Sequence, residues 1–258
     1  MNCRILLLAM TALIIFSSTA NARDYNALGP ITTRNQNPVY LQTLSLTPMR
    51  AYVLPEGTIE GRIDSAYSSV FLKNANTTAD LNLDMEIWRI SPWLTYGIAE
   101  GMEVGIEIPF LHFSAGVLDT FIQKFHNTFH FPNGGRDQVA DGQFSYRLDA
   151  GGSTQFNFTS ADMGLGDISL HFKNQLTGED RKLPALAWFV DLKLPTGQKS
   201  RGFGSGSVDM GFGLAAEAEY KRLHGFINVG YYAIGGNNLF VDYIHNEMLA
   251  YMIAGELS

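Results

Sequence analysis

The sequence predicts an all-β protein, an antiparallel transmembrane β-barrel of the outer-membrane type with about eight strands. Three observations lead to this fold class. Polar and apolar residues alternate with a period of two, the predicted connections alternate between long and short, and an export signal opens the chain. The composition agrees, because 26 glycines and 12% aromatic residues accompany only 17% charged residues.

The first 22 residues have the pattern of a secretory signal peptide. Arg4 precedes an apolar run over residues 5–16, and Ala20-Asn21-Ala22 offers a small-residue cleavage site. The run is shorter than the roughly 20 apolar residues that a transmembrane helix needs. We therefore expect cleavage after Ala22 and a location in the cell outer membrane. The one cysteine, Cys3, leaves with this segment, so we expect no disulfide.

The remaining chain divides into two parts. Residues 23–57 contain Pro30, Pro38, Pro48 and Pro55 and are expected to form a periplasmic arm or an inward plug. Residues 58–258 are expected to form the barrel domain, with a long external loop at 114–163. The predicted strands are 58–72, 81–98, 102–113, 164–176, 184–195, 207–220, 225–234 and 246–257.

Within the segment 81–98 the apolar residues change from odd to even positions. Leu83, Met85 and Ile87 give way to Ile90 and Leu94. A one-residue change of phase predicts a β-bulge near residues 88–92, where Pro92 has no N–H for the ladder.

The connections indicate the topology. Short connections are expected at 99–101, 177–182 and 221–224, and long ones at 73–80, 114–163, 196–206 and 235–245. Outer-membrane barrels show this asymmetry, with short periplasmic turns and longer external loops. A soluble lipocalin-like barrel is the alternative that also alternates.

Charge distinguishes the two faces of the predicted strands. A charge that faces lipid near the middle of the bilayer costs roughly 2–4 kcal/mol, so we expect the charged positions to face the lumen. These lumen-facing residues are Glu60, Arg62, Asp64, Glu103, Glu107, Asp167, His171, Lys173, Asp191, Lys193, Asp209, Glu217 and Glu219. Their acidic excess predicts a pore that favours cations or polar solutes. The alternative is a network that fills a narrow barrel without a through-path.

The long loop contains apolar residues at helical spacing over 117–129, which predicts an amphipathic helix. Its stripe consists of Leu118, Phe121, Ile122, Phe125 and Phe129. So apolar a stripe must cover the barrel mouth, another loop or the outer leaflet. We expect the helix to fold inward as a lid over the mouth, because the loop begins at the end of the third strand and this path is the shortest. A further hairpin is expected at 143–158.

Other functional classes find little support. The net charge of -7 and the pI near 5.3 argue against a nucleic-acid partner. Ser169 and His171 share a strand face, so a lipid-modifying enzyme is one alternative, but no nucleophile-elbow motif accompanies them. His126 and His130 are too few for a zinc site. We therefore expect no catalytic site, no cofactor and no metal.

Short motifs spread over nearly the whole mature chain: Leu28-Gly29-Pro30, Arg34-Asn35-Gln36-Asn37-Pro38, Leu54-Pro55-Glu56-Gly57, Tyr96-Gly97-Ile98, Pro109-Phe110, Gly164-Leu165-Gly166-Asp167 and Lys193-Leu194-Pro195-Thr196-Gly197. Together they resemble an exported bacterial family catalogued as domain-of-unknown-function family 3187. They also look like outer-membrane proteins of the phenol-degradation MetA pathway. The resemblance implies a barrel and supplies no catalytic residue.

The carboxyl end departs from the usual pattern of outer-membrane barrels, which finish on a strand with an aromatic last residue. This sequence ends Ile253-Ala254-Gly255-Glu256-Leu257-Ser258. We expect either an atypical closing signal or a chain that lacks closing C-terminal strands.

The predicted function is that of a passive channel or carrier for small molecules, with outer-membrane lipid and a small-molecule solute as partners. The first alternative is a structural or surface-interaction barrel with a packed lumen. The second is the lipid-modifying enzyme.

Overall fold

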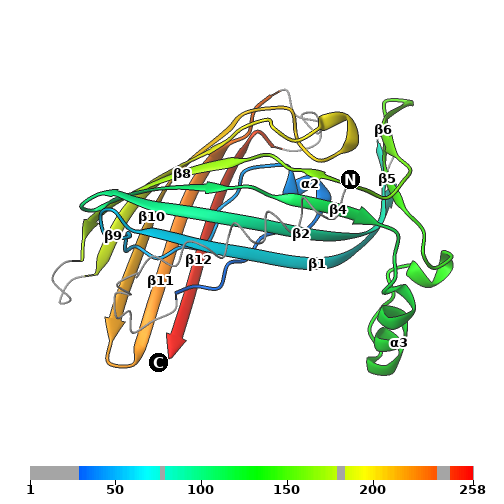
Figure 1. The fold of residues 1–258 in the computed structure, drawn as a ribbon. Coiled ribbons are helices and arrows are strands. Elements are labelled where there is room, and N and C mark those ends of the chain that lie inside the picture. The colour runs from blue at the N-terminus through cyan, green and yellow to red at the C-terminus, as the bar shows by residue number, and fades with distance from the viewer. Residues whose placement is uncertain (1–28, 76–78, 179–183, 237–244, 258) are drawn as a thin grey trace, which may run out of the picture.

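A computed structural model describes residues 29–75, 79–178, 184–236 and 245–257 of the protein (Figure 1). The predicted signal peptide, with its cleavage site after Ala22, lies outside the described residues. In the described part of the chain, no helix has the length and apolar character needed to cross a membrane.

One antiparallel sheet of twelve strands makes up most of the described chain. Its strands are β1 (Ile59–Ala75), β2 (Ala79–Ala99), β3 (Met102–Glu107), β4 (Phe110–Ser114), β5 (Ser145–Ala150), β6 (Ser153–Phe158), β7 (Asp162–Leu165), β8 (Ser169–Thr177), β9 (Ala185–Lys193), β10 (Asp209–Tyr220), β11 (Leu223–Ala233) and β12 (Glu247–Leu257). The helices are α2 (Pro38–Leu41), α3 (Asp119–Phe129) and the 3₁₀ turns η1 (Arg136–Gln138) and η2 (Lys199–Arg201).

Ten of the twelve strands follow eight lines through the sheet. Both β3 and β4 pair with β2 and are separated at Ile108-Pro109, where proline has no N–H to donate. Correspondingly, β7 pairs with β4 and β8 with β3. Counting β3 with β4 as one line and β7 with β8 as another, and leaving the β5–β6 hairpin aside, gives the eight segments predicted from alternation. The predicted second hairpin at 143–158 is β5–β6.

The predicted bulge in the second strand is wrong. β1 and β2 pair in one unbroken register, from Ile59 opposite Tyr96 to Ala75 opposite Asp80. Between residues 80 and 96 the odd positions of β2 therefore face one side, and only their surroundings change. The one register shift seen in β2 lies further on, between Gly97 and Ala99 opposite β3. The pairing of β1 with β2 also shows that the predicted connection 73–80 is largely strand.

The connections lie at two distinct ends of the sheet. At the short-turn end, β2 meets β3, β8 meets β9, and β10 meets β11, whereas the segments 115–161 and 194–208 lie at the long-loop end. In Figure 1 the short-turn end is on the left, and the β5–β6 hairpin and α3 mark the long-loop end on the right.

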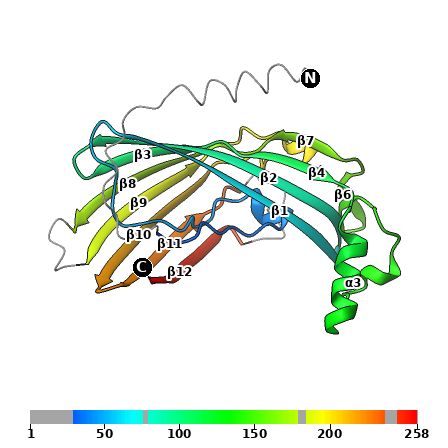
Figure 2. The same cartoon turned by 60° about the horizontal axis from the view of Figure 1, so that its bottom comes forward.

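The sheet is strongly curved but is not closed into a barrel (Figure 2). Among the described residues, β1 pairs with β2 alone and β12 pairs with β11 alone. The predicted all-β antiparallel architecture is thus present, as a mostly antiparallel sheet with two edges.

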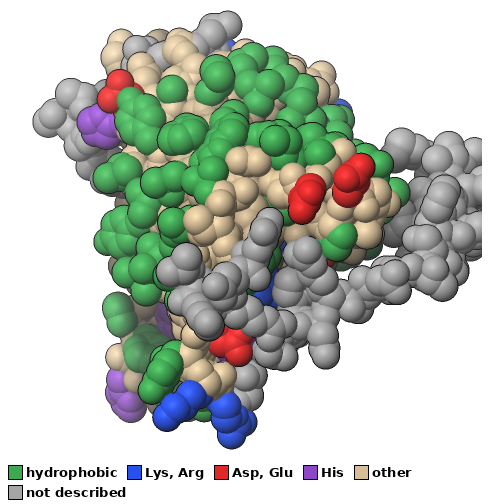
Figure 3. Space-filling view, turned by 90° about the vertical axis from the view of Figure 1, so that its left-hand side faces the viewer, with side chains coloured by type: hydrophobic (Ala, Val, Ile, Leu, Met, Phe, Trp, Pro, Cys, Tyr) green, Lys and Arg blue, Asp and Glu red, His purple; other side chains and the backbone are tan. Residues whose placement is uncertain are grey.

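The two faces of the sheet differ in chemistry. Residues 29–57, which we call the arm, cover one face, and we call this the inner face. The opposite, outer face carries exposed apolar side chains at alternate positions, such as Met210, Phe212 and Leu214 of β10. In the space-filling view from the short-turn end, apolar side chains gather over the upper part of the molecule (Figure 3).

At the long-loop end the inner face holds the main apolar core. Leu83, Met85 and Ile87 of β2 pack there with Tyr146 of β5. The arm contributes Val39 and Leu41 from α2, and the inward-folded connection between β9 and β10 contributes Phe203. The apolar odd positions that suggested a change of phase are therefore core residues on the inner face.

Glycines on the inner face of β10 make room for aromatic rings. A Cβ on Gly213 would lie 2.2 Å from Cζ of Phe189 and 2.5 Å from the carbonyl oxygen of Val229. We expect Gly213→Ala to lower the free energy of unfolding by about 1–3 kcal/mol, as overpacking does. Urea unfolding of the purified protein measures this.

The matched control is Gly225→Ala in β11, where the nearest atom to an added Cβ is 4.0 Å away. We expect a change within about 0.5 kcal/mol there. Equal losses at the two positions would contradict this account of Gly213.

Candidate functional site: the inner face and the arm

The arm runs along the inner face in both directions. It begins at the short-turn end, where the Gly29 N–H donates to Glu256 Oε2 at 3.0 Å. It reaches the long-loop end at α2, whose first turn is fixed by Pro38 and by the Asn37 side chain, which accepts from the Val39 N–H. It returns to the short-turn end, where the Gly57 N–H donates to the Gly97 carbonyl at 2.8 Å.

Polar side chains of the sheet hold the returning half of the arm. Its backbone N–H groups donate to carboxylates and amides: Leu44 to Asp209 (2.9 Å), Met49 to Asn228 (2.9 Å), Val53 to Gln175 (3.2 Å) and Leu54 to Glu103 (2.7 Å). Arg50 of the arm also forms a salt bridge with the buried Glu217. In Figures 1 and 2 the arm passes between β1–β2 and β10–β12.

The structure places the thirteen charged residues predicted for the lumen on the inner face. The strand register puts twelve of them there, and Asp167, between β7 and β8, reaches it through Lys193. Eleven take part in ion pairs or in the His171–Asp191 hydrogen bond, whereas Glu60 and Glu219 are exposed. That this face lines a lumen stays a prediction, because the sheet is open.

The inner face is less acidic than the sequence suggested. Arg89 of β2 is buried in a salt bridge with Glu107, and Arg34 and Arg50 arrive from the arm. Burial lowers the pKa of Arg34, while the nearby Asp209 and Asp167 act in the opposite direction. Strand alternation could not predict that Arg34 and Arg50 lie on the inner face, because only the tertiary path of the arm brings them here.

A buried network of charged side chains lies on the inner face, toward the long-loop end. Lys193 Nζ lies 2.8 Å from Asp167 Oδ2 and 3.2 Å from Asp209 Oδ2, and all three side chains are at most 3% exposed. Asp167 accepts further hydrogen bonds from the N–H groups of Gly197 and Ser205, both at 2.9 Å. The network thus fixes the connection between β9 and β10 against the sheet.

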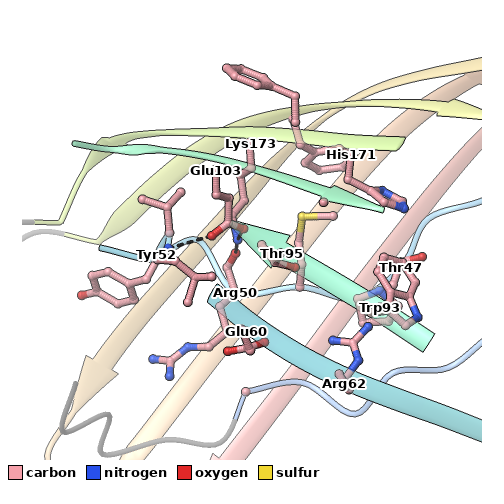
Figure 4. Close-up of a pocket in the computed structure, with 18 of the residues that line it drawn as sticks. Thr47, Arg50, Tyr52, Glu60, Arg62, Trp93, Thr95, Glu103, His171 and Lys173 are labelled. Carbon is pink, nitrogen blue, oxygen red and sulfur yellow. Dashed lines mark hydrogen bonds and ion pairs between the residues drawn. The ribbon is translucent and has the colours of Figure 1, made fainter. Parts of the chain in front are cut away.

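A cavity of about 450 Å³ lies between the arm and the inner face. Strands β1, β2, β3, β8 and β9 line one side of it, and arm residues 47–54 line the other. Glu103 and Lys173 from neighbouring strands lie together at 2.8 Å (Figure 4). The guanidinium of Arg62 stacks over the ring of Trp93, 4.7 Å from its centroid. The walls therefore present both signs of charge together with aromatic side chains, among them Trp93 and Phe189.

His171 forms a second polar group in this cavity. Its Nδ1 is 2.8 Å from Asp191 Oδ1, and the Tyr232 hydroxyl donates to the other oxygen of Asp191 at 3.2 Å. The ring of His171 packs against that of Trp93, with centroids 4.7 Å apart. His171 Nε2 has no hydrogen-bond partner among the described residues, so Ser169 is not poised there as a nucleophile.

The predicted loop helix exists as α3, but it does not lie over the inner face. The buried Glu86, on the outer face of β2, accepts from the N–H groups of Val117 and Leu118 at 2.8 and 2.6 Å. The negative charge of Glu86 in this place also interacts favourably with the positive end of the helix dipole. The stripe of Leu118, Phe121, Ile122, Phe125 and Phe129 therefore lies outside the sheet, and the expected lid over the mouth is not the arrangement seen.

The sequence of residues 4–249 matches the model of one protein family, described as "Protein of unknown function (DUF3187)". The chain belongs to this family. The motif resemblance to that family is thereby confirmed, while the likeness to the phenol-degradation MetA-pathway proteins stays a prediction. No curated protein matches the chain.

The described part of this family member contains no group of three or more His, Asp or Glu side chains that could hold a metal ion. The chemistry that the inner face does offer is binding. Paired charges, the Trp93 ring and the His171 imidazole can contact a small polar molecule.

Removing the ammonium group of Lys193 should leave two buried carboxylates without a counter-charge. We expect Lys193→Met to lower the free energy of unfolding by about 3–5 kcal/mol at pH 7.5. Urea unfolding of the purified protein at this pH measures the loss.

The control is the double variant Lys193→Met with Asp167→Asn, which removes one of the two negative charges. It should recover part of the stability at pH 7.5. A loss that is unchanged in the double variant would show that Lys193 contributes packing alone.

Proposed function

We propose that this protein is an outer-membrane β-barrel in which the arm fills the lumen, and that it acts as a gated, narrow carrier or channel for small polar molecules. One observation carries the proposal: a charged inner face, bearing a cavity with both signs of charge, is covered by a segment that backbone hydrogen bonds and a salt bridge hold in place beside its apolar contacts.

The outer face supports the membrane location. In the described strands β3, β8, β9, β10 and β11, no outward position carries Asp, Glu, Lys or Arg. Several apolar residues on this face are half exposed or more, among them Ile227 and Leu214 at 50% and 55%. A continuous apolar surface of this size is unfavourable in water but suits the hydrocarbon region of a bilayer.

Closure of a barrel from the described strands alone requires that β1 pair with β12. The eight lines alternate in direction, so the first and the last are antiparallel to each other, as an even-numbered barrel demands. In a bilayer each unpaired backbone group at the two edges costs several kcal/mol, which gives a strong drive to close.

The contacts of the arm favour a plug that can be displaced. The net contribution of one hydrogen bond to stability is about 0.5–1.5 kcal/mol, because water can replace the protein partner. The returning half of the arm makes such bonds to Asp209, Asn228, Gln175 and Glu103, beside the buried apolar contacts of Leu44 and Ala51. Water or a polar solute can take these places when the arm moves.

The structural barrel with a packed lumen is the second candidate, and the buried Lys193 network favours it. That network and the adjacent apolar core close the long-loop end in the described state. The lipid-modifying enzyme receives no comparable support, since His171 lies on the inner face and is not bonded to a hydroxyl nucleophile.

The membrane location predicts different tolerance of the two faces to arginine. We expect Leu214→Arg, on the outer face, to cost about 2–4 kcal/mol near the middle of the bilayer and to reduce assembly. Glu60→Arg, on the inner face, should assemble normally. Heat-modifiable migration of outer-membrane fractions on gels measures assembly; recovery of the wild-type chain as a soluble periplasmic protein would refute the membrane location.

Gating by the arm predicts a change in conductance. The wild-type protein should show rare, short openings in a planar bilayer. The double variant Arg50→Ala, Glu217→Gln removes the arm's salt bridge without leaving an unpaired charge, and should open at least several-fold more often. Arg147→Ala, which removes an exposed ion pair within β5, is the control and should leave the opening frequency unchanged. A folded double variant that stays closed would favour the packed structural barrel instead.

A further inference from the structure

Helix α3 carries an exposed aromatic cluster on the outside of the sheet. Phe121, Phe125 and Phe129 are 64%, 44% and 57% exposed, and Phe131 just beyond the helix is 53% exposed. Their rings touch one another rather than the sheet, with centroids 4.7 Å apart for Phe125 and Phe129 and 6.1 Å for Phe125 and Phe131. This surface is large for a loop that faces water.

Buried polar contacts fix the position of the cluster. Asp119, at the start of α3, forms a buried salt bridge with Arg136 and accepts from the Gly142 N–H at 2.8 Å. Arg136 in turn stacks over Phe71, on the outer face of β1. The helix is thus held rigidly beside the outer face.

The polar side of α3 faces its own loop. Thr120 Oγ1 and Gln123 Nε2 donate to the two oxygens of Asp141 at 2.6 and 2.8 Å. The three phenylalanines, spaced four residues apart, form one edge of the helix away from these bonds. The helix is therefore amphipathic, with its polar side already occupied.

The direction of α3 fits a membrane surface. In both ribbon views the helix runs crosswise to β1 and β2 at the long-loop end (Figures 1 and 2). If the strands cross the bilayer, a crosswise helix at their end lies along its surface. The outer face of β1 and β2 next to it continues as Tyr67, Trp88 and Ile63, which are all exposed.

We propose that α3 is an interfacial helix, and that Phe121, Phe125 and Phe129 insert into the lipid of the leaflet at the long-loop end. This inference rests on the proposed membrane location. The apolar edge of the helix then extends the lipid-facing surface of the strands sideways, at the depth where amphipathic helices bind bilayers.

The experiment places an environment-sensitive fluorophore at single cysteines in the full chain carrying Cys3→Ser. The positions are Phe125→Cys on the apolar edge, Asn127→Cys on the opposite side of α3, and Phe212→Cys on the outer face of β10. Each labelled protein is reconstituted into phosphatidylcholine–phosphatidylglycerol vesicles, with or without lipids brominated near the top of the acyl chain.

We expect bromolipid to reduce the emission at Phe125→Cys at least two-fold and to leave Asn127→Cys unchanged. Quenching at Phe212→Cys without quenching at Phe125→Cys would overturn the role of α3 and leave the membrane location intact. No quenching at either position would overturn both.

A second copy of the chain is the competing partner for the cluster. Shielding of Phe125→Cys that disappears on dilution in detergent, without bromolipid quenching in vesicles, would assign the cluster to that contact and refute the lipid proposal.

Discussion

The structure depends on one constraint: the charged groups of the inner face must find partners once the arm and the curved sheet remove them from water. A buried unpaired charge costs several kcal/mol, so almost every such group here is matched. Neighbouring strands supply some partners, as in Glu103 with Lys173 and Arg89 with Glu107. The arm supplies the others, through Arg50 at Glu217 and through the N–H group of Leu44 at Asp209.

This constraint explains why an irregular segment can cover a face of a sheet. Extended backbone carries a row of N–H groups with no partner of their own, and the inner face carries carboxylates that lack donors. The N–H groups of the arm and the carboxylates of the inner face therefore form hydrogen bonds with each other. The two halves of the face are nevertheless unequal. Toward the long-loop end Lys193 and the apolar core leave no space, whereas near the short turns Glu103, Lys173 and Trp93 border a cavity.

Local alternation was sufficient to predict the eight lines of the sheet, because a period of two directly reports which side chains share a face. The same reasoning failed in β2. Leu83, Met85 and Ile87 are apolar and inward, because the core lies over that part of the face, while Asp84 and Glu86 point outward beneath the loop that holds α3. Alternation alone cannot distinguish a change of register from a change of environment. The family match likewise adds membership and no chemistry.

The arm and α3 could be recognised in the sequence as segments but could not be placed. The position of α3 depends on Glu86, more than thirty residues away in the chain, whose carboxylate receives two N–H groups at the start of the helix. The arm's charge balance depends on contacts between residues as distant as Arg50 and Glu217. The two cases share one physical cause. In each, a carboxylate on a strand binds donors of an irregular segment and so determines which segment lies over it. In a sheet whose strands are set by alternation, the positions of such carboxylates decide where the remaining chain is held, and therefore which parts of each face it leaves uncovered.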